Sequence, residues 1–425
     1  MGSISKACQL KEFFNGIDKN SSPLNLITNK NDFQLNDFTT IVSKQLSKSI
    51  ELNSPHNHNV EETKKFNIEI KDAIYGTVCI DSPCAIEIID LKDFKRLKNV
   101  LQHGITALIG CLPTPSISRF DHSLGAMILV KSAGGTEEAQ LAALLHDVAH
   151  TAFSHVVDYV FDYVVHEVEK FQYLETTKIP QILRKYGFNP ERILNEELFP
   201  LLELPSPEIC ADRLDYGLRD SVSFGFLSLK ESQEIFESIL SIDGQLVLSS
   251  MRAASILANA YLDSDQNVWA DPCQTYLYRL TAKVIKAALL EGTIDRSFLW
   301  KTGDQELWEL LNQKCSRSTK KLIAQINGHC KVTEIDPSQM IDPEEKIFEI
   351  DSSDFLDGDG DQKLIRMKLK LRAIDPLVRT SESEEVRLKR LSEINPDFSR
   401  RLKDYVRSRE KARIYRVENT SKQID

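Results

Sequence analysis

The chain has 425 residues, of which 41% are hydrophobic and 27% charged, and its formal net charge is −10. This length allows roughly two or three domains with buried cores, and the composition is that of a globular protein. The negative charge argues against sequence-independent binding of nucleic acid. The sequence contains no run of about 18 apolar residues that could span a membrane. Because there is no signal peptide and no CxxC pair among the eight cysteines, we expect a cytoplasmic or nuclear protein with reduced thiols.

The first part of the chain is polar and the next part is patterned for helices. Residues 1–65 are rich in Asn, Ser and Lys, which predicts a polar, partly disordered region. A turn and an alternating strand are expected over 68–80. Apolar spacing then predicts an amphipathic helix that stops at Gly104. Further helices are expected over 122–133, 136–153, 206–220 (with Pro207 at the first helical position) and 275–292.

The last part of the chain changes character. Residues 296–425 include alternating, β-rich segments, and a final helix is expected near 396–413. The predicted strands lie at 329–335, 345–351 and 365–375. We therefore predict a mainly α fold with three parts: the polar region 1–65, a helical core over 66–295, and a small α+β C-terminal region over 296–425.

Histidine is concentrated in one short part of the chain. Five of the nine histidines lie between His122 and His166, and this stretch contains the doublet His146-Asp147. In the sequence HDVAH, His146 and His150 are four residues apart, so we expect them to share a helix face with Asp147 beside it. Imidazole and carboxylate ligands suit Mn, Fe, Co, Ni, Zn and Mg. The pattern predicts a divalent-metal site, without selecting the metal.

Three sequence blocks carry a resemblance to a known family. They are RFDHSLG at 119–125, LLHDVAHTAFSH at 144–155 and ADRLDYGLRD at 211–220. In this order they resemble the signature blocks of the HD-domain metal-dependent phosphohydrolases, and most of all the deoxynucleoside triphosphate triphosphohydrolases of the SAM-and-HD-domain type. No SAM domain is evident in residues 1–65. The resemblance implies an HD-domain helical core, a metal that activates water for hydrolysis of (deoxy)nucleoside triphosphates, and a homo-oligomer.

The same resemblance assigns roles by position. The metal ligands would be His122, His146, Asp147 and Asp212. Three histidines beside the metal would be catalytic: His150 and His155 facing the phosphates, and His166 as general acid or base. Substrate contacts would come from Arg119 to phosphate and from Gln102, Tyr216 and Asp220 to the sugar. Lys283 also matches the family by position, and it and Arg279 are the two cations that could bind distal phosphates. Asp215 and Arg219 are expected to form a structural pair on the helix that carries Asp212.

The substrate and the number of metals stay open. The arginine that clamps distal phosphates in the family would fall near Pro272, where no basic residue stands. One alternative is therefore an HD-type hydrolase of another phosphate ester or diphosphate. Another is a di-iron oxygenase, in which His150 and His155 would bind a second metal. We expect one divalent ion, with a second still open, and a small phosphate-bearing substrate, with neither membrane nor nucleic acid as partner.

Overall fold

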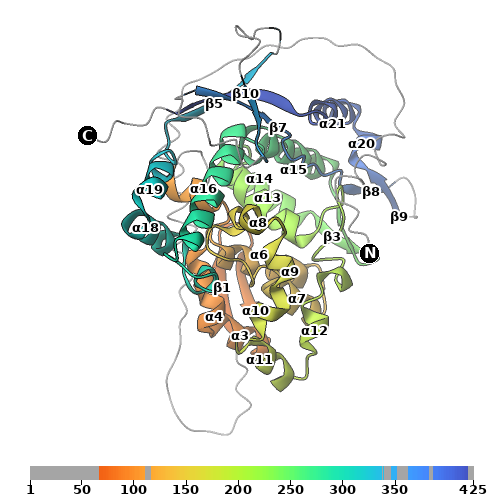
Figure 1. The fold of residues 1–425 in the computed structure, drawn as a ribbon. Helices are drawn as coiled ribbons and strands as arrows, with labels where there is room; N and C mark the ends of the chain where they lie inside the picture. The colour runs from red at the N-terminus through yellow and green to blue at the C-terminus, as the bar shows by residue number, and fades with distance from the viewer. Residues whose placement is uncertain are drawn as a thin grey trace, which may run out of the picture.

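The computed structural model describes residues 67–110, 116–336, 338, 346–351, 362–381 and 386–419. The predicted polar region 1–65 lies outside the described residues. The rest is mainly helical, with β-sheets toward the C-terminus, which confirms the predicted fold class (Figure 1). No helix in the described ranges is long and apolar enough to cross a membrane.

The described part begins with a hairpin, in which β1 (Ile68–Asp72) pairs antiparallel with β2 (Gly76–Ile80). The prediction of a single helix that stops at Gly104 is wrong. The chain instead forms α3 (Pro83–Asp90), α4 (Lys92–Lys95) and η1 (Arg96–Asn99), and Gly104 begins α5 (Gly104–Ile109). Gly104 has a φ of +49°, and a Cβ atom there would lie 2.9 Å from the carbonyl oxygen of Phe153. This close approach explains why the glycine lies inside the fold rather than at a helix end.

Five helices carry predicted site residues or pack against a helix that does. They are α6 (Arg119–Ser132), α7 (Glu137–Leu145), α13 (Ala211–Ser223), α15 (Met251–Ser264) and α16 (Pro272–Leu290). Helix α6 contacts both α7 and α13, and α13 contacts α15. The expected start of α13 at Pro207 is wrong, because the N–H of Glu208 donates to the carbonyl of Pro205 in a turn and the helix begins only at Ala211.

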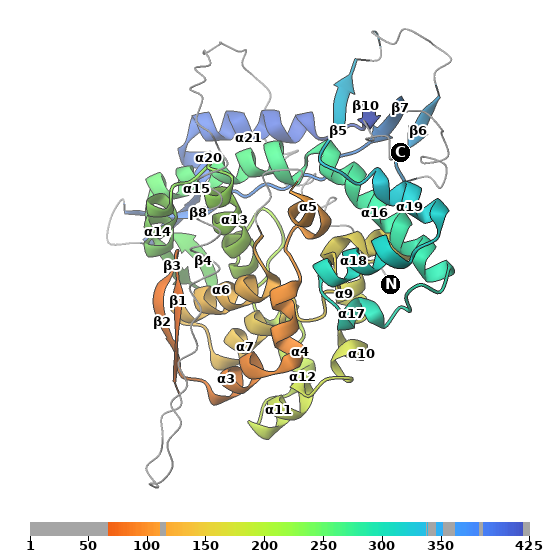
Figure 2. The same cartoon turned by 90° about the vertical axis from the view of Figure 1, so that its left-hand side faces the viewer.

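Other helices connect and cover these elements. They are η2 (Ser154–Val156), α8 (Asp158–Phe161), α9 (Val165–Val168), α10 (Lys170–Leu174), α11 (Ile179–Lys185), α12 (Pro190–Ile193), η3 (Glu196–Leu198), α14 (Leu229–Glu237), the π-helical η4 (Asp265–Trp269), α17 (Phe298–Lys301), α18 (Asp304–Lys314), α19 (Arg317–Ala324), α20 (Leu391–Ile394) and α21 (Pro396–Ser408). Helix α21 lies along α15 (Figure 2). It ends five residues before the predicted end at 413, and the chain continues as a strand.

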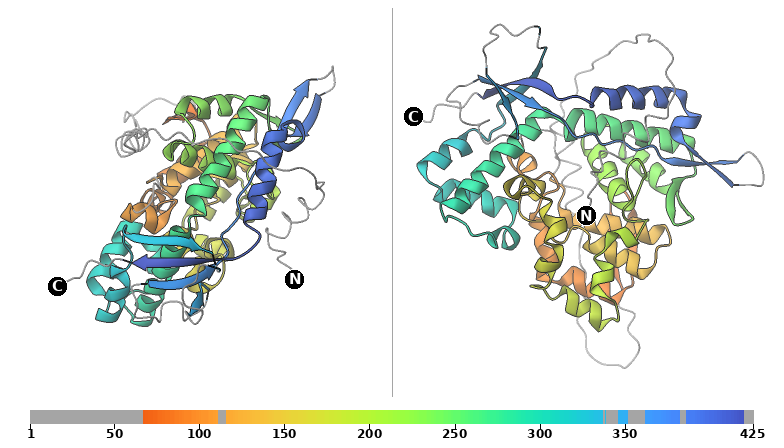
Figure 3. Two further views of the ribbon diagram at one scale, coloured as in Figure 1. Left: turned by 90° about the horizontal axis from the view of Figure 1, so that it is seen from above. Right: turned by 45° about the vertical axis from the view of Figure 1, so that its right-hand side comes forward.

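Two four-stranded sheets complete the fold. One has the order β5 (Cys330–Ile335), β10 (Arg413–Asn419), β7 (Gln362–Met367) and β6 (Ile347–Glu349). The other has the order β3 (Ile239–Ile242), β4 (Gln245–Leu248), β8 (Leu377–Ser381) and β9 (Val386–Arg390). Figure 3 shows β8 and β9 extending away from the helices. Because β8 pairs in parallel with β4, this second sheet contains strands from both sides of residue 295.

The buried side chains form two hydrophobic clusters. The first is centred on α6, α7, α13 and α15, and the second on α5, α16 and α18. Val148 belongs to the first cluster and Ala152 to the second. The chain therefore crosses from one core to the other within HDVAHTAF, where the functional histidines were predicted.

Candidate metal centre

Nitrogen and oxygen atoms from α6, the end of α7 and α13 converge on one point. Nε2 of His122 lies 3.1 Å from Nε2 of His146 and 3.1 Å from Oδ1 of Asp212. An oxygen of Asp147 lies 3.6 Å from Nε2 of His122 and 3.7 Å from Nε2 of His146. The structure thus brings together the four residues predicted as metal ligands, which we call the metal-donor cluster.

The far side of each imidazole shows which nitrogen is available to a metal. Nδ1 of His122 donates to Oδ2 of Asp215 over 2.8 Å, and Nδ1 of His146 donates to the carbonyl of Ala143 over 2.7 Å. In a neutral imidazole whose Nδ1 carries the proton, Nε2 holds a lone pair. Two such lone pairs 3.1 Å apart repel each other unless a proton or a metal ion lies between them. This arrangement fits a divalent ion with imidazole and carboxylate ligands.

The charges around the cluster also favour a bound cation. Burial opposes the charging of His122, but hydrogen bonds to Asp212 and Asp215 outweigh it and raise the pKa of His122 to about 10. Burial also opposes ionisation of Asp147, yet the nearby Arg119 guanidinium and two histidines hold the pKa of this carboxyl well below its usual range. The cluster therefore contains ionised carboxylates around a position that attracts positive charge.

Asp215 has a role at the cluster that sequence analysis missed. It forms the predicted pair with Arg219, whose Nε lies 2.9 Å from Oδ2, and it also accepts the Tyr75 hydroxyl over 2.7 Å. Its remaining contact is the hydrogen bond that orients His122. Asp215 reaches His122 only because residue 125 is glycine, where a Cβ atom would lie 1.7 Å from Oδ1 of Asp215. That glycine, inside RFDHSLG, was the available sequence signal.

The HDVAH segment is not helical, so the expectation that His146 and His150 share a helix face is wrong. Helix α7 ends at Leu145, and turn hydrogen bonds follow from Val148 to Leu145 and from His150 to Asp147. The side chain of His146 takes the Ala143 carbonyl, which an α-helix would have bonded to a later main-chain N–H. As a result His146 faces the metal-donor cluster, whereas His150 faces a second group.

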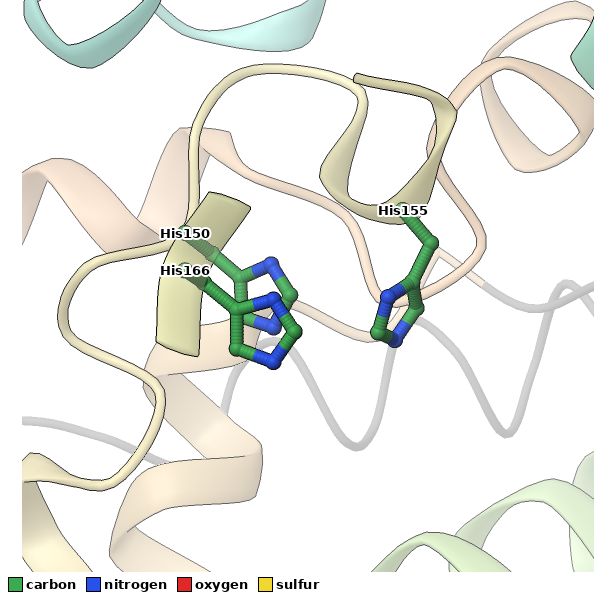
Figure 4. Close-up of side chains that lie close together, drawn as sticks. All are labelled: His150, His155 and His166. Carbon is green, nitrogen blue, oxygen red and sulfur yellow. The ribbon is translucent and has the colours of Figure 1, made fainter. Parts of the chain in front are cut away.

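This second group is the histidine trio of His150, His155 and His166 (Figure 4). The rings of His150 and His166 stack with centroids 3.7 Å apart and an interplanar angle of 20°, and His155 meets both rings edge-on. Their ring nitrogens lie within 4.8 Å of one another, close enough for an ion. A metal ion lies in the plane of each imidazole that binds it, however. Two stacked rings have nearly parallel planes, so one of them would have to rotate before both could bind the same ion. The predicted catalytic histidines are therefore gathered in one place, in an arrangement that suits an anion better than a second metal.

Burial keeps His150 and His166 of the trio uncharged. It lowers the pKa of His166 to about 2, with the neighbouring His155 acting in the same direction. It also holds the pKa of His150 well below the ordinary value, although Nε2 of His150 lies 3.2 Å from Oδ1 of Asp147. His155 is the most open of the three, with 49% of its side chain exposed and Nδ1 3.0 Å from Asp158.

Several predicted substrate residues carry buried polar atoms that have no hydrogen-bond partner among the described residues. These atoms are Oε1 of Gln102, Nη2 of Arg119 and Oδ1 of Asp220, together with Nδ1 of His166 in the trio. Buried polar atoms are rarely left without a partner in folded proteins. Their presence in four residues selected from sequence suggests surfaces that a ligand completes.

Other polar atoms of the predicted substrate residues form hydrogen bonds within the protein. Nε of Arg119 donates to Oγ of Ser154 over 2.7 Å, and Nη1 donates to Asp147. Oδ2 of Asp220 accepts from His103 over 3.0 Å and from Trp269 over 2.7 Å. The Tyr216 hydroxyl pairs with that of Tyr261, and the Tyr216 ring centroid lies 6.3 Å from that of His122. Lys283 is half-buried on α16.

Comparisons with known proteins agree with this geometry. A family model for the HD domain matches residues 119–216, a stretch that contains all four members of the metal-donor cluster. The metal-dependent phosphohydrolase cns2 of Cordyceps militaris is 38% identical over 270 residues, which cover 61% of this chain and 77% of cns2. Human deoxynucleoside triphosphate triphosphohydrolase SAMHD1 is 30% identical over 165 residues, which cover 32% of this chain and 26% of SAMHD1. The predicted likeness to the SAM-and-HD-domain type is therefore partial.

A solved structure extends the likeness to the fold. A phosphohydrolase from Bacteroides thetaiotaomicron aligns with a TM-score of 0.55 at 18% identity, covering 82% of this chain and 98% of that one. At this identity the likeness concerns the fold alone. The family match, together with the 38% identity to cns2 over most of the length of cns2, shows the family as well as the fold. The chain belongs to the HD-domain metal-dependent phosphohydrolases.

Proposed function

We propose that the chain hydrolyses a nucleotide at its phosphate groups, with (deoxy)nucleoside triphosphates as the first substrate class. The observation that carries this proposal is that Asp147 joins the metal-donor cluster to the histidine trio. Its Oδ2 faces the Nε2 atoms of His122 and His146, and its Oδ1 lies 3.2 Å from Nε2 of His150. A phosphate bound beside the trio would thus adjoin the metal.

The metal-donor cluster and Arg119 would prepare the phosphorus for attack. His122, His146, Asp147 and Asp212 would hold one divalent ion. When bound, such an ion lowers the pKa of water and polarises phosphorus–oxygen bonds. Nη2 of Arg119, which is buried and has no partner among the described residues, would donate to a phosphate oxygen while Nη1 stays on Asp147.

The trio would carry the proton to the leaving oxygen. Because burial lowers the pKa of His166 to about 2, its imidazole is neutral at pH 7 before the substrate binds. A phosphate beside it raises the imidazole pKa, since the negative charge favours the charged ring. The phosphate charge would shift His166 toward the protonated form, in which the imidazole can donate its proton as general acid. His150 and His155 would line the same phosphate.

The sugar would lie beside α13. Asp212, Tyr216 and Asp220 follow one another at intervals of four residues on this helix. Within the part of the chain that the structure describes, Oδ1 of Asp220 and Oε1 of Gln102 have no partner, and both could accept hydrogen bonds from sugar hydroxyls. The Tyr216 ring would flank the sugar, since its hydroxyl is already paired with Tyr261.

A phosphomonoester is the second candidate, and the pairing around α16 favours it. Arg279, one of the two cations that could grip distal phosphates, forms an ion pair with Asp351. The N-terminus of α16 is capped by Asp271, whose carboxylate accepts from the N–H groups of Cys273 and Gln274. A carboxylate at this helix end opposes a polyphosphate there.

Metal analysis followed by a phosphate-release panel tests both candidates. The protein is stripped, reloaded separately with each candidate ion, and offered deoxynucleoside triphosphates, nucleoside monophosphates and small phosphate esters. Inorganic triphosphate as product supports the first class. Orthophosphate from monoesters alone supports the second. The absence of phosphate release from every compound by metal-loaded protein would contradict both.

A further inference from the structure

A buried carboxylate outside the predicted site contacts both segments that frame it. Asp304 lies at the start of α18, a helix outside the family-matched stretch, and is 1% exposed. Its Oδ2 accepts the N–H of Leu101 over 3.0 Å, and its Oδ1 accepts the N–H of Phe153 over 2.8 Å. One side chain thus ties together two loops that are distant in sequence.

The two loops lead directly to Arg119. The hydroxyl of Ser154 donates to the carbonyl of Leu101 over 2.8 Å and accepts from Nε of Arg119 over 2.7 Å. Arg119 in turn donates to Asp147. Asp304 therefore lies at the start of a continuous hydrogen-bonded path to the Arg119 guanidinium, whose Nη2 is unpaired within the described ranges.

The path passes through a strained turn. Phe153 and Ser154 have φ angles of +61° and +50°, a left-handed conformation that L side chains rarely adopt. Such residues persist only where their surroundings hold them. Here the restraints are the bond from Phe153 to Asp304, the bond from the Ala152 N–H to the carbonyl of Leu299 at 2.9 Å, and the contact with Gly104. Immediately after the turn comes His155.

We propose that Asp304 is a positioning residue of the hydrolytic site. By bonding Leu101 and Phe153 at once, its carboxylate holds the Phe153–Ser154 turn, and through Ser154 it fixes the Arg119 guanidinium for phosphate. This inference rests on the proposed phosphate contact of Arg119. It adds a residue from α18 to the functional unit, although α18 contributes no atom to the metal-donor cluster.

Asp375 supplies a matched control. It is as buried as Asp304, and its carboxylate likewise bonds a distant backbone N–H, that of Ser392 at 3.0 Å, together with the Ser392 hydroxyl at 2.6 Å. None of these side-chain contacts involves the metal-donor cluster or the trio. Loss of a buried carboxylate as such should therefore affect both aspartates, whereas loss of positioning should affect Asp304 alone.

The test uses metal-loaded, full-length protein and orthophosphate as the probe. Asp304→Asn, Ser154→Ala, the double variant and Asp375→Asn are compared by metal content, by orthophosphate affinity from calorimetry, and by urea unfolding. Asp304→Asn is expected to keep wild-type metal content and to bind orthophosphate at least tenfold more weakly. Asp375→Asn should keep wild-type phosphate affinity at a similar loss of stability. The double variant should be no weaker than the weaker single variant, because both changes act on one turn.

The outcomes separate this inference from the proposed function. If wild-type protein binds orthophosphate and Asp304→Asn binds it within twofold, the positioning role is wrong and the function stands. The role is equally wrong if the losses in the double variant multiply. If wild-type protein binds no orthophosphate, the proposed phosphate contact of Arg119 is wrong, and the positioning role of Asp304 is then wrong as well. If Asp304→Asn does not fold, Ser154→Ala alone decides, since it must weaken phosphate binding at unchanged metal content.

Discussion

The two halves of the site differ in how completely the protein holds them. In the metal-donor cluster each imidazole is fixed from behind, His122 by Asp215 and His146 by the Ala143 carbonyl. In the trio, Nδ1 of His166 is buried without a partner among the described residues, and half of the His155 side chain is exposed. The first half is organised before substrate arrives, whereas the second lacks a polar partner that a substrate can supply. In the proposed function the metal half would activate the water, and the trio half would bind the phosphate and supply the proton.

The largest effect is expected where the two halves meet. Asp147 faces both the metal-donor cluster and His150, so Asp147→Ala should remove the metal and the hydrolysis together. We expect a rate loss of at least about 1,000-fold, equivalent to about 4 kcal/mol in the barrier. Metal content by mass spectrometry and phosphate release measure the two losses. Hydrolysis retained in this variant would falsify the site assignment.

A change confined to the trio should separate chemistry from metal binding. His166→Gln removes the proposed acid, and we expect phosphate release to fall about 100- to 10,000-fold while the metal stays bound. His329→Gln is the control, because His329 is an exposed histidine near β5, away from the trio. The distinction between the halves breaks down if His166→Gln protein loses its metal.

A change behind the metal-donor cluster should be milder. Asp215→Asn keeps the size of the side chain but removes the charge that faces Nδ1 of His122. Loss of such an outer partner lowers metal affinity about 10- to 100-fold. Titration against a competing chelator measures this, with Asp375→Asn as the control for loss of a buried carboxylate. Equal metal affinities in the two variants would show that Asp215 serves folding alone.

Sequence reasoning found the donors because each stands inside a recognisable block. The three blocks contain His122, the His146-Asp147 doublet and Asp212, which together form the metal-donor cluster. What sequence reasoning missed depends on tertiary contact. The separation of His146 from His150 follows from the early end of α7, and the role of Asp215 follows from close packing against Gly125.

The fold shows the same division. The strands β5 and β6 were predicted because their sequences alternate. The strand predicted over 365–375 is mostly wrong, because β7 spans Gln362–Met367 and residues 368–375 form no strand. The strands β3 and β4 were missed although Asp243-Gly244 between them is a strong hairpin signal. Asp304 had no signal of any kind. It occupies the start of an ordinary helix, and its partners Leu101 and Phe153 bond it only through their backbone N–H groups. No residue pattern records such a contact.

The smallest effect concerns stability and tests whether the trio awaits an anion. Unfolded histidine binds a proton near pH 6.5, whereas His166 in the folded chain does so only near pH 2. Between these values the unfolded state holds more protons, so the free energy of unfolding falls as pH drops below about 6.5. Between pH 7 and pH 5, His166 should account for a decrease of at most about 2 kcal/mol in the free energy of unfolding. This contribution should be absent from His166→Gln protein in urea unfolding.

Orthophosphate should weaken this pH dependence in wild-type protein. An anion beside His166 favours the charged imidazole and raises its pKa, so the folded state regains protons that it otherwise excludes. Saturating phosphate should therefore bring the wild-type slope between pH 7 and pH 5 toward that of His166→Gln, while the slope of the variant changes less. A wild-type slope that phosphate leaves unchanged would mean that the missing partner of His166 is not the phosphate. The trio would then have to be assigned to another part of the substrate.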